Sequence, residues 1–71
     1  GLVAAATAQA NAGDSRLAIA TAENIEAARY RAIVFGNTAI AEARAENFAQ
    51  ARITLDRAKI LSAEIGLPYA S

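Results

Sequence analysis

The side chains that could perform chemistry are few in this chain of 71 residues, and none forms a complete catalytic set. Glu42 and Glu46 are four residues apart, a spacing that brings two carboxylates to one helix face, where acid–base chemistry could use them. The chain has no histidine and no cysteine, so the common general base, the thiol nucleophile and the usual zinc ligands are absent. Because Arg44 lies between the two glutamates, we expect a solvated helix face here.

Residues 14–16 place the hydroxyl of Ser15 beside the charged side chains of Asp14 and Arg16, which could suggest a nucleophile. No general base accompanies Ser15, whereas Asp14 or Ser15 is well suited to cap the start of a helix. The four glycines are scattered, and no Gly-Lys-Ser/Thr loop is present to bind phosphate. We therefore predict that the protein is not an enzyme, and we assign no catalytic residue, no cofactor and no metal site.

Tyr30 lies between Arg29 and Arg31, and an aromatic ring flanked by cations could stack on nucleic-acid bases. However, Glu26 is one turn away, and seven basic residues are balanced by seven acidic ones, so the net charge is zero. Proteins that bind nucleic acid or anionic membrane surfaces carry an excess of basic side chains. We therefore expect Tyr30 at a surface or interface and no nucleic-acid partner. No run reaches the roughly 18 apolar residues of a membrane span.

Alanine occupies 21 positions, against one proline and four glycines, and this composition favours helices. Helix-breaking residues gather in three places, at 13–15, 36–38 and 66–68. We predict an all-α fold, a small bundle or solenoid-like unit that packs against other chains, with helices at about 2–12, 14–35 and 38–65. The domain is expected to span 1–71, with a short uncharged N-terminal segment, 1–13, and an extended C-terminal tail, 66–71.

The N-terminal residues 2–10 are uncharged and end in Ala8-x-Ala10, as the tail of a secretory signal peptide does. No basic stretch precedes them, so a short alanine-rich helix packed at an interface is the favoured interpretation. Localisation stays open between the cytoplasm and export after processing.

A domain of this size is marginally stable unless cross-links, a metal or association supplement its core. Since cysteine and histidine are absent, association remains, most simply with copies of the same chain and alternatively with a partner protein or peptide. Phe35 and Phe48 are expected in the core, and Tyr69 at a contact with a neighbouring subunit. The candidate interface and packing residues are Leu17, Ile25, Tyr30, Ile33, Phe35, Ile40, Phe48, Ile53, Leu55, Ile60, Leu61, Ile65 and Tyr69.

Two internal offsets give partial sequence matches, as a helical repeat would. At an offset of 36, residues 16–27 match 52–63 at several positions. At an offset of 33, Ala18 matches Ala51, and Gly13 meets Glu46 at an expected turn. Alanine is abundant enough to inflate such matches, so both offsets stay open.

Gly13-Asp14 followed by Ala18, and the run 47–51 followed by Leu55 and Ala58, resemble a tetratricopeptide-like helical repeat. In that family a second helix begins with an aromatic residue and has a small alanine three positions later, as Phe48 and Ala51 do. Ser15, where an aromatic residue is expected, and Gly36 depart from the pattern.

The resemblance implies a scaffold whose stacked helix pairs present a concave surface, and it moves the second break from Gly36 toward Glu46-Asn47. One uninterrupted helix through Tyr30–Ala45 would count against it. The favoured interpretation is a structural, self-assembling protein, the subunit of a homo-oligomer or filament-like helical assembly. The alternative is a tetratricopeptide-like adaptor fragment that binds a peptide or partner protein.

Overall fold

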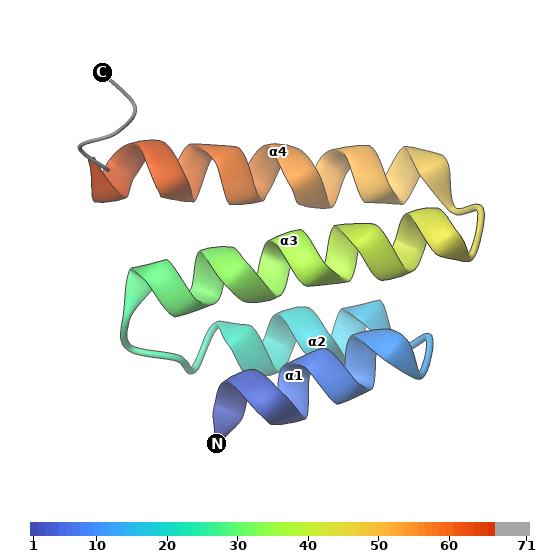
Figure 1. The fold of residues 1–71 in the computed structure, drawn as a ribbon, viewed down its shortest axis with the longest axis horizontal. Coiled ribbons are helices and arrows are strands. Elements are labelled where there is room, and N and C mark those ends of the chain that lie inside the picture. The colour runs from blue at the N-terminus through green and yellow to red at the C-terminus, as the bar shows by residue number, and fades with distance from the viewer. Residues whose placement is uncertain (67–71) are drawn as a thin grey trace.

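The computed structural model describes residues 1–66, and this part of the chain is all-α, as predicted (Figure 1). Its helices are α1 (Leu2–Asn11), α2 (Ser15–Ala22), α3 (Ala28–Arg44) and α4 (Phe48–Ile65). Helices α1 and α2 form a short hairpin, α3 and α4 form a longer one, and α3 packs against the other three. The molecule measures 33 × 26 × 15 Å. Because 15 Å is little more than one helix diameter, most helices keep a face in solvent.

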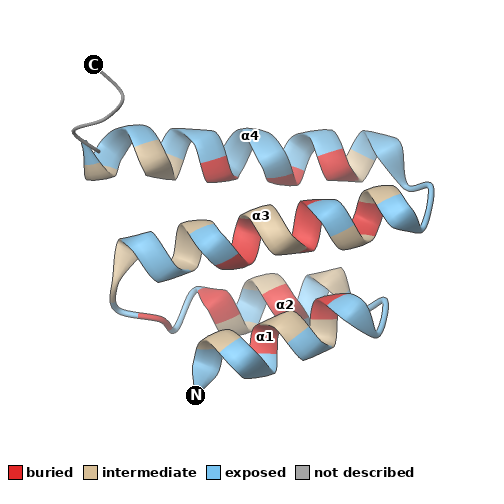
Figure 2. Cartoon of the chain, in the orientation of Figure 1, coloured by how far each residue is buried: buried red, intermediate tan, exposed pale blue. Residues whose placement is uncertain are grey.

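The core is small and is built around α3. Figure 2 shows that the buried residues of α4 lie on the side that faces α3, while its opposite side is exposed. The central cluster consists of Ala6, Ala22, Ile25, Val34, Phe35 and Ala58, with Val3, Ile19 and Leu61 packed against it. This cluster combines a few large apolar side chains with alanines, whose small methyl groups let the helix axes approach closely.

The first break in the chain is where the sequence predicts it. Gly13 adopts a φ of +91°, in the left-handed region that favours glycine, and ends the turn after α1. Asp14 then caps α2, because its Oδ1 accepts a hydrogen bond from the Leu17 N–H at 3.1 Å. The capping role expected for Asp14 is confirmed.

The expected helix over 14–35 is wrong, since α2 ends at Ala22 and α3 begins only at Ala28. The intervening residues contain no glycine or proline. Ile25 lies in this loop and is buried in the central cluster, which a continuous helix would not allow. Arg31 stabilises the loop by donating to the Ile25 carbonyl and, at 2.9 Å, to the Glu26 carbonyl. Burial of the Ile25 side chain, together with the hydrogen bonds from Arg31 to the loop backbone, outweighs the helix propensity of these residues.

The expected helix over 38–65 is also wrong. Gly36 lies inside α3, where a glycine costs about 1 kcal/mol relative to alanine without ending the helix. The break falls at residues 45–47 instead, with Glu46 at a φ of +64° and Asn47 at the N-cap of α4. This is the position that the repeat interpretation gives. Local propensity missed it because glutamate rarely adopts left-handed backbone geometry.

The two hairpin turns are the same structure at an offset of 33 residues. Gly13 and Glu46 hold the left-handed positions, and Asp14 and Asn47 follow as N-caps. The matching N–H to carbonyl bonds are Gly13 to Ala10 at 3.0 Å, Glu46 to Ala43 at 2.9 Å, Asp14 to Gln9 at 3.0 Å and Asn47 to Glu42 at 2.9 Å. An offset of 36 would instead pair Gly13 with Ala49, which lies inside α4. The 33-residue correspondence is therefore the structural one.

Gly66 ends α4 in the left-handed conformation, with a φ of +67°. This confirms the third predicted break. The rest of the expected tail, 67–71, lies outside the described residues, and so does Tyr69.

Replacing Glu46 with glycine is expected to stabilise the fold by about 0.5–1 kcal/mol, because a left-handed non-glycine residue costs about 1–2 kcal/mol and glycine returns part of this as backbone entropy. The measurement is the free energy of unfolding by urea at a fixed protein concentration.

The matched control is Ala45→Gly, one residue earlier at a φ of −82°, where glycine only adds entropy and should destabilise the protein. Equal destabilisation by both variants would contradict the explanation of the turn.

Candidate functional site

Small side chains fill the interior, and large ones lie on the surface. Among residues 1–66, seven of the ten buried hydrophobic residues are alanines: Ala6, Ala10, Ala18, Ala22, Ala39, Ala51 and Ala58. In the same part of the chain, nine large hydrophobic side chains are exposed: Leu2, Leu17, Tyr30, Ile33, Ile40, Phe48, Ile53, Leu55 and Ile60. Isolated exposed apolar residues are ordinary, but a surface enriched in them while alanine fills the core is typical of an interaction surface.

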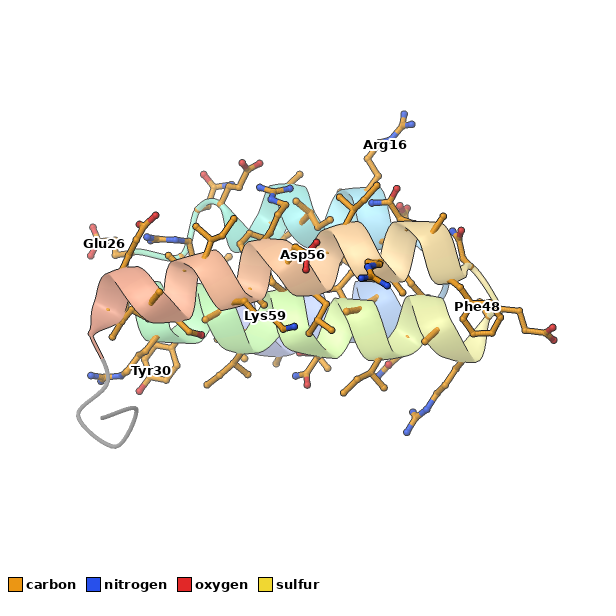
Figure 3. All side chains as sticks on the ribbon, turned by 90° about the horizontal axis from the view of Figure 1, so that it is seen from above. Arg16, Glu26, Tyr30, Phe48, Asp56 and Lys59 are labelled. Carbon is orange, nitrogen blue, oxygen red and sulfur yellow. The ribbon has the colours of Figure 1, made fainter. Side chains whose placement is uncertain are left out.

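The structure separates the residues that the sequence grouped as interface and packing candidates. Ile25 and Phe35 are buried, so Phe35 is in the core as expected, and Leu61 and Ile65 are partly buried. Phe48 is 65% exposed, so its expected place in the core is wrong. It stands at the first position of α4, beside the turn (Figure 3). The remaining described candidates are exposed: Leu17, Tyr30, Ile33, Ile40, Ile53, Leu55 and Ile60.

The main candidate surface is a groove between α3 and α4, with a volume of about 630 Å³. We call it the α3/α4 groove. Its lining residues are Gly36, Ala39, Ile40, Ala43, Phe48, Ala51, Arg52, Leu55, Asp56 and Lys59. Small residues form much of the lining, and Ile40, Phe48 and Leu55 add exposed apolar area. Its charged members are two cations and one anion, all on α4, so the groove resembles a site for an apolar helix more than one for an ion.

A second hollow, of about 480 Å³, lies where α4 passes the loop between α2 and α3. Arg57 is its central side chain: its guanidinium is 3.8 Å from the Glu23 carboxylate and 4.8 Å from the centroid of the Phe35 ring. Both partners of this ion pair are largely exposed, so the pair contributes little to stability. Its contact with Phe35 covers one edge of the core.

No catalytic arrangement forms among the residues that the sequence singled out. Ser15 follows the capping Asp14, and within residues 1–66 its hydroxyl makes no hydrogen bond to a basic side chain. Tyr30 is paired with Arg29, whose guanidinium carbon is 4.8 Å from the ring centroid, while Arg31 turns to the loop carbonyls. The two arginines that flank Tyr30 therefore contact different partners. Among residues 1–66, no three Asp, Glu, His or Cys side chains are placed to share a metal ion.

Glu42 contradicts the solvated helix face expected for it. Its side chain is only 4% exposed, whereas Glu46 is on the surface at the turn, so the two carboxylates do not form a pair. Within the described residues, neither Glu42 oxygen has a hydrogen-bond partner, and the buried hydroxyl of Thr54 has none either. Glu42 lines a small cavity of about 50 Å³ between the two hairpin turns, together with Ser15 and Asn47.

The corresponding side chains of the first hairpin are bonded to each other. Thirty-three residues before Glu42 and Thr54 stand Gln9 and Thr21, and the Thr21 hydroxyl donates to Gln9 Oε1 at 2.7 Å. At these equivalent positions the first hairpin has an amide and a hydroxyl that are hydrogen-bonded to each other. The second hairpin has a carboxylate and a hydroxyl, and neither has a partner within the described residues. Neither pair was predicted from the sequence, whose signal for them is the identity of Thr21 and Thr54 at the offset of 33.

Comparisons with known proteins give no relative: no family model, no curated protein and no solved structure matches this chain. No helix in residues 1–66 is long and apolar enough to cross a membrane.

Replacing Glu42 with glutamine is expected to stabilise the protein by about 1–2 kcal/mol, because it removes an unpartnered buried carboxylate and restores the amide found at Gln9. The measurement is the free energy of unfolding by urea at pH 7 and fixed protein concentration.

The control is the same change at the exposed turn, Glu46→Gln, which removes a solvated carboxylate and should leave the free energy of unfolding nearly unchanged. If Glu42→Gln lowers stability instead, the carboxylate has a stabilising partner and the interpretation is wrong.

Proposed function

We propose that this chain is a non-enzymatic structural protein that reaches its working stability by associating with copies of itself, in an oligomer or filament-like helical assembly. The observation that carries the proposal is the distribution of side chains in the described residues, where most of the buried apolar residues are alanines and nine large apolar residues are exposed.

The energetic reason is that the internal core contributes little stabilising free energy. Burying one methyl or methylene group contributes about 0.8 kcal/mol, whereas fully burying a leucine, isoleucine or phenylalanine contributes about 1.5–3 kcal/mol. In the described part of the chain only Ile25, Val34 and Phe35 are large apolar residues that are buried. Nine large apolar side chains of the same described residues remain exposed, and contact with another chain would bury them.

The charge distribution agrees with self-association. Basic and acidic residues balance to a net charge of zero, which removes the long-range repulsion that keeps many small proteins apart. An assembly held by apolar contacts would also be insensitive to salt, since screening weakens ionic contacts and leaves apolar burial intact.

Sedimentation equilibrium from the low micromolar range upward tests the proposal. The average mass is expected to exceed the 7.3 kDa of one chain, to fall on dilution and to change little with added salt. The melting temperature should fall with the mass, because association stabilises only the folded state. A chain that stays monomeric and keeps the same helicity and melting temperature at every concentration would rule the proposal out.

A second function, an adaptor that binds a peptide, is favoured by one specific feature of α3. Tyr30, Ile33, Asn37 and Ile40 follow a 3-4-3 spacing, so they share one face of the helix, and the three apolar members are exposed. Figure 3 shows Tyr30 extending from α3 on the side opposite to Arg16 of α2. The two matched hairpins also agree with a repeat, whereas the continuity of α3 from Ala28 to Arg44 counts against the tetratricopeptide resemblance.

Selection of a phage-displayed library of random peptides on the immobilised protein tests the adaptor function. Selected peptides should lose binding to Ile33→Lys, which charges the middle of this face, and keep it on Ile53→Lys, an equally exposed position of α4. Absence of any peptide that distinguishes the two variants would remove the adaptor as a candidate.

A further inference from the structure

The two hairpins present equivalent grooves, and the structure shows how the first is filled. Helix α3 packs against both α1 and α2 and covers the groove between them. The α3/α4 groove corresponds to it at an offset of 33 and is open within the described residues. The molecule itself thus shows which kind of helix such a groove accepts.

The floors of the two grooves correspond position by position. Under α3 the first groove has buried alanines at 6, 10, 18 and 22. Thirty-three residues later stand Ala39, Ala43, Ala51 and Leu55, which all line the α3/α4 groove. Leu55 is 44% exposed where Ala22 is completely buried, because no helix covers the second groove.

The face of α3 that fills the first groove also has a counterpart. Val34 contacts the cluster of Ala6 and Ala22, and Ala41 and Ala45 share the small cavity with the first turn. Val34, Thr38, Ala41 and Ala45 recur every three or four residues and so form one face of α3. The equivalent residues at the offset of 33 are Gly1, Ala5, Ala8 and Ala12. All four are exposed: Ala5 and Ala8 lie on one face of α1, and Gly1 and Ala12 are the N-cap and C-cap of this helix.

We propose that the α3/α4 groove binds α1 of a second copy of this chain, so that the stacking of α3 on the first hairpin continues from one molecule to the next. This inference rests on the proposed self-association and specifies its surfaces. The contact is heterologous, since one copy contributes α1 and the other the groove, and repetition extends it into a filament or closes it into a ring.

The chemistry of the two surfaces is compatible. Helix α1 has no charged side chain, and Gly36, Ala39, Ala43 and Ala51 offer an uncharged surface on which a helix of small residues can approach closely. Arg52, Asp56 and Lys59 all belong to α4 and are exposed, so docking of an uncharged helix need not bury them. Ile40, Phe48 and Leu55 would lose their exposed apolar area on docking.

Two lysine substitutions block the two surfaces separately. Ile40→Lys charges the α3/α4 groove, and Ala8→Lys charges the exposed face of α1. Each is expected to weaken self-association by about tenfold or more, because a lysine would be buried without a partner. The matched controls are Ile53→Lys on α4 and Ala20→Lys on α2, exposed positions outside both surfaces that should associate like the parent protein. Circular dichroism checks that every variant is folded.

Mixing the two blocked variants gives the decisive measurement by sedimentation equilibrium. Ile40→Lys retains an intact α1 and Ala8→Lys an intact groove, so their equimolar mixture should form one-to-one dimers that grow no further. If both variants associate as the parent does, or if the mixture stays monomeric while each variant alone is monomeric, the α1-in-groove contact is wrong. Self-association of the parent protein is measured separately. Either of these two results would contradict the α1-in-groove contact without contradicting the proposed function, whereas a monomeric parent protein would contradict both.

Discussion

Close approach of helices through alanine methyl groups is the interaction on which the rest of this structure depends. Alanines at 6, 10, 18 and 22 form the surface on which α3 lies, and Ala51 and Ala58 hold α4 against it. Small side chains allow α3 to contact three helices, but each contributes little free energy. The same feature that makes the fold compact therefore leaves it with a weak core and a surface that carries most of the large apolar residues.

The 33-residue correspondence explains several features that look unrelated in a single hairpin. Glu46 takes a left-handed conformation because it stands where Gly13 does, and Asn47 stands where Asp14 caps α2. The unpartnered Glu42 and Thr54 stand where Gln9 and Thr21 bond to each other. The second hairpin thus keeps the backbone geometry of the first while departing from its side-chain chemistry, and its strained turn and buried carboxylate follow from that departure.

Part of this fold was predictable from local chemistry. The alanine content determined the all-α class, the Gly13-Asp14 pair determined the first turn, and Gly66 determined the end of α4, because backbone entropy and capping act within a few residues. The balance of charges likewise needs no structure. By contrast, local sequence does not separate the two phenylalanines that were expected in the core: Phe35 is buried, whereas Phe48 is exposed, because burial depends on which helices pack against each position.

Tertiary structure alone decided the remaining features. Ile25 leaves the helix because the core needs its side chain, and no local signal marks that loop. Helix α3 continues through Gly36, because packing of α3 against its neighbouring helices outweighs the cost of about 1 kcal/mol that glycine adds inside a helix. Glu42 is buried because α3 is covered by the first hairpin on one side and α4 on the other. In each case contacts between segments distant in the sequence outweigh the local conformational preferences of single residues, which are of the order of 1 kcal/mol.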